Sequence, residues 1–177
     1  MVACQEKEDV NKKYEPIGEI IATANGGKFP IEGEISQLQF TNTSIVNQQG
    51  IREDGFGFGI FSFSRSGYAR MCCGGFFIPN KIGDYQIVLK DSVDNKGEYI
   101  PKYNGFAILS EDGDAIYSSY DIDATKNNIF TIESIVKNEI KGSFQINYKK
   151  VTGFNSTQYS DTYKVICTKF VCKRLVK

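Results

Sequence analysis

Alternation of apolar and polar residues is the dominant pattern along this chain. The clearest stretch runs from residue 140 to residue 148, where the apolar or small positions are Ile140, Gly142, Phe144, Ile146 and Tyr148. Successive side chains of a β-strand point to opposite faces of the sheet, so this period of two predicts a strand with one buried and one solvated face. We expect Phe144 and Ile146 to point into the core, and Gln145 and Asn147 to face solvent.

Nine further segments carry strand patterns, and turn residues such as Asn25-Gly26-Gly27 and Lys137-Asn138 separate them. The predicted strands cover residues 17–24, 35–41, 56–64, 69–78, 85–90, 105–110, 115–120, 129–136 and 162–171. Helical spacing is scarce by comparison. The pattern therefore predicts an all-β fold, either an antiparallel β-sandwich or an open barrel of about 8–10 short strands.

The length and composition are those of one folded domain behind a short charged segment. The chain has 177 residues, of which 41% are hydrophobic, and the 13 Phe and 10 Tyr provide material for a core. No stretch approaches the roughly 18 consecutive apolar residues that a membrane-spanning helix needs. We expect residues 1–16 to be a lipoprotein-type N-terminus with a charged tether, and residues 17–177 to be a single β-domain.

The N-terminal residues carry a candidate lipidation site. Val2-Ala3-Cys4 resembles the end of a bacterial lipobox, and a charged run follows it as far as Lys13. Lys7-Glu8-Asp9 also resembles the tract behind the lipidated cysteine of surface-exposed lipoproteins in Bacteroidetes. The hydrophobic part of such a signal peptide is missing, so this interpretation requires a trimmed or mis-started chain. It predicts lipid attachment at Cys4, whereas the alternative is a cytoplasmic protein with an incidental cysteine.

Four segments of the body resemble small β-rich lipoprotein domains of unknown function that are widespread in Bacteroidetes. These segments are Ala24-Asn25-Gly26-Gly27-Lys28-Phe29, Ile82-Gly83-Asp84-Tyr85-Gln86-Ile87, Phe130-Thr131-Ile132-Glu133-Ser134-Ile135 and Ile140-Lys141-Gly142-Ser143-Phe144-Gln145-Ile146. The resemblance spans about residues 23–175. It implies an outer-membrane lipoprotein at the cell surface or in the periplasm, attached to the membrane through its lipid, and it supplies no catalytic residues.

Charge and composition exclude several kinds of chemistry. Lys plus Arg and Asp plus Glu both total 21, so no global field favours nucleic acid as a partner. The absence of histidine excludes Ser-His and Cys-His nucleophile chemistry. No cysteine spacing matches a zinc site, and we expect neither a metal nor another cofactor.

Four of the five cysteines are candidates for disulfide bonds, namely Cys72, Cys73, Cys167 and Cys172. Adjacent residues of a straight strand point to opposite faces, and so do residues five apart, so neither pair is expected to bridge within its own strand. Bridges between the two strands are possible if these strands are neighbours. The alternative is that some of the thiols are free and buried.

Clusters of acidic residues raise two further possibilities. They occupy residues 91–94, 111–114 and 121–123, where spaced carboxylates suit calcium and paired carboxylates suit glycoside hydrolysis. Turn chemistry explains residues 112–114 without a ligand. Asp91-Ser92-Val93 also resembles an O-glycosylation acceptor of exported proteins in Bacteroidetes, which makes Ser92 a candidate acceptor.

Two features bear on binding. Gly57 and Gly59 leave one face of their strand without side chains, which allows close approach either by a ligand or by another part of the sheet. The large apolar residues change from even to odd positions at Phe61, and this change predicts a bulge near Ile60. The longest predicted loops cover residues 42–54, 91–104 and 151–161, and the last two contain Tyr99, Tyr103 and Tyr159. Binding residues lie in loops more often than in the hydrogen-bonded strands of a sheet.

We therefore expect a non-enzymatic binding or assembly module, with a glycan or envelope protein as its partner. The alternative is a hydrolase that acts through paired carboxylates, for example on glycans.

Overall fold

The fold is all-β, as predicted, in a computed structural model that describes residues 17–30, 32–46, 50–64, 69–88, 106–110, 116–153 and 160–174. No helix occurs among these residues. The strands are β1 (Glu19–Ala24), β2 (Gly27–Phe29), β3 (Glu34–Val46), β4 (Arg52–Ser64), β5 (Ala69–Pro79), β6 (Gly83–Gln86), β7 (Phe106–Ser110), β8 (Ile116–Ile122), β9 (Ile129–Val136), β10 (Glu139–Gly153) and β11 (Thr162–Arg174).

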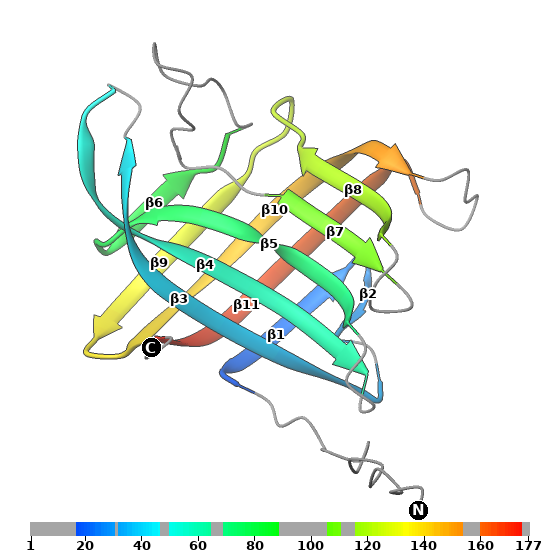
Figure 1. The fold of residues 1–177 in the computed structure, drawn as a ribbon, viewed down its shortest axis with the longest axis horizontal. Helices are drawn as coiled ribbons and strands as arrows, with labels where there is room; N and C mark the ends of the chain where they lie inside the picture. The colour runs from blue at the N-terminus through cyan, green and yellow to red at the C-terminus, as the bar shows by residue number, and fades with distance from the viewer. Residues whose placement is uncertain are drawn as a thin grey trace, which may run out of the picture.

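The strands form one mostly antiparallel sheet that curls into a nearly closed barrel, so the barrel prediction holds and the sandwich does not (Figure 1). The order is β2-β1-β11-β3-β4-β5-β7-β8-β10-β9-β6, and an additional pairing of β11 with β10 brings the sheet back on itself. The seam between β11 and β3 is parallel and has only two residue pairs, Lys173 with Gln39 and Arg174 with Phe40. This short seam leaves the barrel incompletely closed.

Strands β8 and β9 follow one another along the same edge of β10. Ile122 pairs with Tyr148 at the end of β8, and Ile129 pairs with Gln145 at the start of β9. Residues 123–128 leave the ladder between them. The Asn128 side chain provides hydrogen bonds where the strand pairing is interrupted. Its Oδ1 accepts from the Asn147 backbone at 2.7 Å, and its Nδ2 donates to the Asp123 carbonyl at 2.8 Å.

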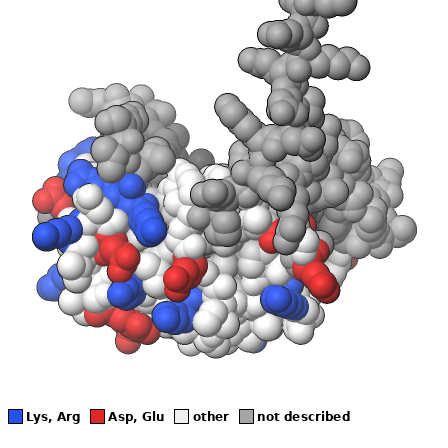
Figure 2. Space-filling model, turned by 90° about the horizontal axis from the view of Figure 1, so that it is seen from below, with Lys and Arg blue, Asp and Glu red and all other residues white. Residues whose placement is uncertain are grey.

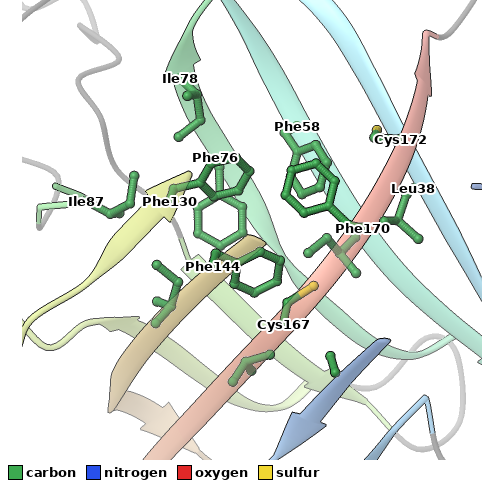
Figure 3. Close-up of a cluster of buried hydrophobic side chains, with 14 of the residues drawn as sticks. Leu38, Phe58, Phe76, Ile78, Ile87, Phe130, Phe144, Cys167, Phe170 and Cys172 are labelled. Atoms are coloured by element: carbon green, nitrogen blue, oxygen red, sulfur yellow. The ribbon is translucent and has the colours of Figure 1, made fainter. Parts of the chain in front are cut away.

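Phenylalanines from opposite walls fill the middle of the barrel (Figure 3). Their ring centroids lie 4.9 to 6.1 Å apart, and the five rings belong to Phe58, Phe76, Phe130, Phe144 and Phe170. The predicted orientation of β10 is confirmed, because Phe144 and Ile146 are buried in this core. Gln145 and Asn147 lie on the other face, where both are half-buried.

The long loop predicted over residues 42–54 is wrong. Strand β3 continues to Val46 and β4 begins at Arg52, with regular pairing throughout. Ile45 explains the extension, because its buried side chain packs where a Cβ on Gly55 would otherwise lie, 2.8 Å away. In contrast, the strand predicted over residues 85–90 ends early, since β6 stops at Gln86.

Two of the three glycines of β4, Gly57 and Gly59, are covered by aromatic rings of the same sheet. A Cβ on Gly57 would lie 3.6 Å from the Phe77 ring, and one on Gly59 would lie 2.7 Å from the Phe61 ring. This agrees with the tight sheet contact and not with a bare face. A register shift does lie at Ile60, between the pairs Gly59–Gly75 and Phe61–Cys72, but its extra residue belongs to β5. Strand β4 itself pairs regularly with β3, so the predicted shift of phase along β4 is wrong.

Candidate functional site

One end of the barrel interior is lined with tyrosine instead of phenylalanine. We call it the tyrosine end and define it as Ser118 and Tyr120 of β8, Tyr148 of β10 and Tyr163 of β11. Tyr148 pairs with Tyr163 across β10 and β11, which places both rings at the same level. The ring centroids of Tyr148 and Tyr163 lie 6.2 Å apart, and those of Tyr120 and Tyr163 lie 5.7 Å apart.

The tyrosine end is largely enclosed. Tyr120 and Tyr148 are each 1% exposed, and Tyr163 is half-buried. The Tyr120 hydroxyl donates a hydrogen bond of 2.7 Å to the Ser160 carbonyl, which connects this end of the core to the start of β11. Burial raises the pKa of the Tyr120 phenol, and the Asp161 carboxylate raises it further. Tyr120 is therefore a neutral hydrogen-bond donor at ordinary pH.

The hydroxyl of Ser118 has no hydrogen-bond partner although Ser118 is fully buried. Burial raises the pKa of the Tyr120 phenol, and the Ser118 side chain opposes this by lowering that pKa. Every other buried side-chain oxygen or nitrogen in the described part of the chain has a hydrogen-bond partner. A buried polar group without a partner costs about 1–3 kcal/mol, and a bound water or ligand group is a common reason for one.

Asp123, which lies in the third predicted acidic cluster, sits in surroundings that favour its carboxylate form. Of the three predicted acidic clusters, residues 91–94 and 111–114 lie outside the described residues. Asp123 accepts from the Thr125 hydroxyl at 2.6 Å and from its backbone at 3.0 Å, and these bonds lower the pKa of the Asp123 carboxyl. A general acid in glycoside hydrolysis needs a raised pKa instead. Within the described ranges, no three His, Cys, Asp or Glu side chains converge to hold a metal ion.

The two strands that would have to be neighbours for the cysteine bridges do not pair with each other in the sheet. Strand β5, which contains Cys72 and Cys73, pairs with β4 and β7, whereas β11 pairs with β1, β10 and β3. Cys167 and Cys172 are buried free thiols. Burial raises the pKa of Cys167 to about 12 and raises the pKa of Cys172 as well.

The parity argument for Cys167 and Cys172 is also wrong, because β11 is not straight. Gly142 pairs with Phe170 and Phe144 pairs with Cys167, so two residues of β11 lie opposite Ser143. This bulge shifts the alternation by one residue. Both thiols therefore point into the core (Figure 3).

The other candidate residues lie outside the described residues. These are Cys4, Ser92, Tyr99, Tyr103 and Tyr159. Sequence reasoning missed the tyrosine end itself, although the alternation of β10 already assigned Tyr148 to the inward face. A tyrosine at an inward position near the end of each of several strands is the signal that points to such a site.

Comparison with protein-family models, with curated proteins and with solved structures finds no match. None of the described residues belongs to a helix long and apolar enough to cross a membrane.

Proposed function

We propose that this chain is a non-enzymatic, lipid-anchored domain of the cell envelope that binds its ligand at the tyrosine end. The observation that carries the binding site is the unpartnered hydroxyl of buried Ser118 beside three tyrosine rings. Phenylalanine rings fill the middle of the barrel, whereas polar groups line the tyrosine end; the other buried polar side chains of the described chain belong to Ser36, Ser62 and Asn128.

The geometry of β11 supports display of this end away from an anchor. Strand β1, where the folded domain begins, pairs Glu19 with Val171. Tyr163 lies eight residues before Val171, which corresponds to about 26 Å along a strand. A lipid on Cys4 would therefore hold the domain by the end opposite to the tyrosines. The resemblance to Bacteroidetes lipoproteins supports the lipid anchor itself.

The ligand class that we propose is a glycan, or a polar segment of an envelope protein. Tyrosine rings offer a flat apolar surface and a hydroxyl together, which suits the apolar faces and hydroxyl groups of sugars. The free Ser118 hydroxyl can both donate and accept a hydrogen bond.

The binding site is tested by screening the purified domain against arrays of glycans and envelope proteins. We expect hits that weaken in Tyr163→Ala and Ser118→Ala. Tyr85→Ala is the matched control, because Tyr85 of β6 donates to the Lys81 carbonyl and pairs with Phe130, outside the tyrosine end. Hits that Tyr163→Ala and Ser118→Ala leave unchanged contradict the site. If such hits weaken when Tyr99, Tyr103 and Tyr159 become Ala, recognition belongs to the loops.

The anchor and the absence of catalysis are tested separately. With the full precursor, we expect Cys4→Ser to leave the membrane fraction, and retention of this variant there contradicts the lipid anchor. Against a panel of glycosides, esters and peptides, we expect no turnover. Reproducible hydrolysis that a single Asp or Glu substitution abolishes would favour the hydrolase alternative.

A further inference from the structure

We infer that the end of the barrel where the chain enters lies against a membrane surface that carries anionic lipid headgroups. This inference rests on the proposed lipid anchor. The surface concerned, which we call the basic edge, comprises Val136, Lys137, Lys141, Lys173 and Arg174.

The strand register brings the basic edge together from two distant parts of the chain. Glu139 at the start of β10 pairs with Lys173 near the end of β11. The Arg174 backbone then donates to the Asn138 carbonyl at 2.8 Å, so the last residues of β11 lie beside the β9–β10 turn. Lys137 occupies this turn.

The charge of the basic edge is only partly neutralised within the described chain. Glu139, which lies opposite Lys173, forms an ion pair of 3.0 Å with Lys141, and Glu19 lies opposite Val171. Lys137, Lys173 and Arg174 form no ion pair with any described residue. Figure 2 views the molecule from below and shows Lys and Arg more densely on one side of this face, with Asp and Glu among them.

An exposed apolar side chain accompanies these cations. Val136 is 61% exposed immediately before the β9–β10 turn. Cations that flank an exposed apolar group are the combination that favours the headgroup region of a membrane.

The tether reaches the fold beside the basic edge. Ile17 forms a parallel bridge with Gln37 on β3, and Lys173 pairs with Gln39 two residues further along β3. Residues 5–16 separate Cys4 from Ile17, and twelve residues span at most about 43 Å. An anchored Cys4 thus keeps the basic edge within reach of the lipid headgroups.

Charge can set the orientation because the two ends are far apart. Glu139 and Lys149 are separated by ten residues of β10, or about 33 Å, whereas surface charges are screened over about 8 Å at physiological salt. Each cation near an anionic surface favours the bound orientation about fivefold. The tyrosine end then faces away from the membrane.

The test uses the full chain with an N-terminal histidine tag on vesicles that contain nickel-chelating lipid. The chain has no histidine of its own, so only the tag supplies imidazole groups. Lysine acetylation is followed residue by residue with mass spectrometry, on vesicles of phosphatidylcholine with and without phosphatidylglycerol. We expect phosphatidylglycerol to lower the labelling of Lys137, Lys141 and Lys173 severalfold, and to leave Lys126 and Lys164 unchanged.

A charge variant tests the cause of the protection. The triple variant combines Lys137→Gln, Lys173→Gln and Arg174→Gln, and in it the remaining Lys141 should lose its protection from acetylation. The parent protein should also lose this protection at about 1 M salt, where surface charges are screened over about 3 Å. The matched control Lys126→Gln, Lys149→Gln, Lys164→Gln should keep it. Equal protection on neutral vesicles, no protection on either, or protection of Lys126 and Lys164 overturns the inference.

This experiment separates the two proposals. The tag replaces the lipid on Cys4, so a negative result refutes the orientation and leaves the anchor standing. Retention of Cys4→Ser in the membrane fraction refutes the anchor without bearing on the labelling pattern.

Discussion

Phe144→Ala is the sharpest test of the barrel core. The Phe144 side chain is 3% exposed and its ring stacks on Phe130 at 5.5 Å, with Phe76 at 5.6 Å and Phe170 at 6.1 Å. Truncation removes a buried ring and leaves a cavity between walls that other parts of the sheet hold in place. We therefore expect a loss of about 3–5 kcal/mol in the free energy of unfolding.

Gln145→Ala is the matched control, since Gln145 is the next residue on the same strand and lies on the other face. It should change stability by no more than about 0.5 kcal/mol. Equilibrium unfolding in urea, followed by far-ultraviolet circular dichroism, measures both variants. The midpoint should fall for Phe144→Ala without a change in slope. Equal losses from the two variants would refute the register of β10.

Three other substitutions or labels test separate features. Gly142→Ala should destabilise strongly, because its Cβ would overlap the Thr131 carbonyl and lie 2.9 Å from the Phe170 ring; an unchanged melting temperature would contradict this packing. Asn128→Ala should cost about 2–4 kcal/mol by leaving buried backbone groups unpaired, because Oδ1 accepts from the Asn147 backbone and Nδ2 donates to the carbonyls of Asp123 and Lys126; an unchanged denaturation midpoint would contradict this role of Asn128. Cys167 and Cys172 should resist iodoacetamide at pH 8 in the folded protein and react in denaturant, because burial raises the pKa of Cys167 to about 12 and that of Cys172 as well; mass spectrometry of each site checks this.

The existence of most strands is predictable from the sequence because burial on one face imposes a period of two. Residues 140–148 show this directly, with inward and outward positions as predicted. The extents of strands are less predictable, since they depend on what the strand packs against. Ile45 extends β3 only because Gly55 on the neighbouring strand leaves room for it. The bulge at residues 168–169 likewise has no local signal, and it reverses the parity of every residue after it.

The alternation of β10 assigns Tyr148 to the inward face, but it does not show that tyrosines of other strands lie beside it. Tyr120, Tyr148 and Tyr163 belong to three strands, and only the pairing of β10 with both β8 and β11 brings them together. That pairing follows from the order of strands around the barrel, which periodicity does not specify. Ser118 carries no motif at all, and its interest arises only from the lack of a partner.

The two ends of the barrel are linked by β10 and β11, and this gives the proposals a common physical basis. Both strands connect the basic edge, the phenylalanine core and the tyrosine end, and they pass these regions in opposite chain directions. Lysines occur along much of both strands: Lys149 and Lys164 lie near the tyrosine end, and Lys173 and Arg174 lie where the strands meet the chain entry. Their inward side chains are phenylalanines in the middle of the barrel, Phe144 and Phe170, and tyrosines at the tyrosine end, Tyr148 and Tyr163. A domain held by its N-terminus therefore presents cations to whatever anchors it and polar aromatic groups to whatever lies beyond.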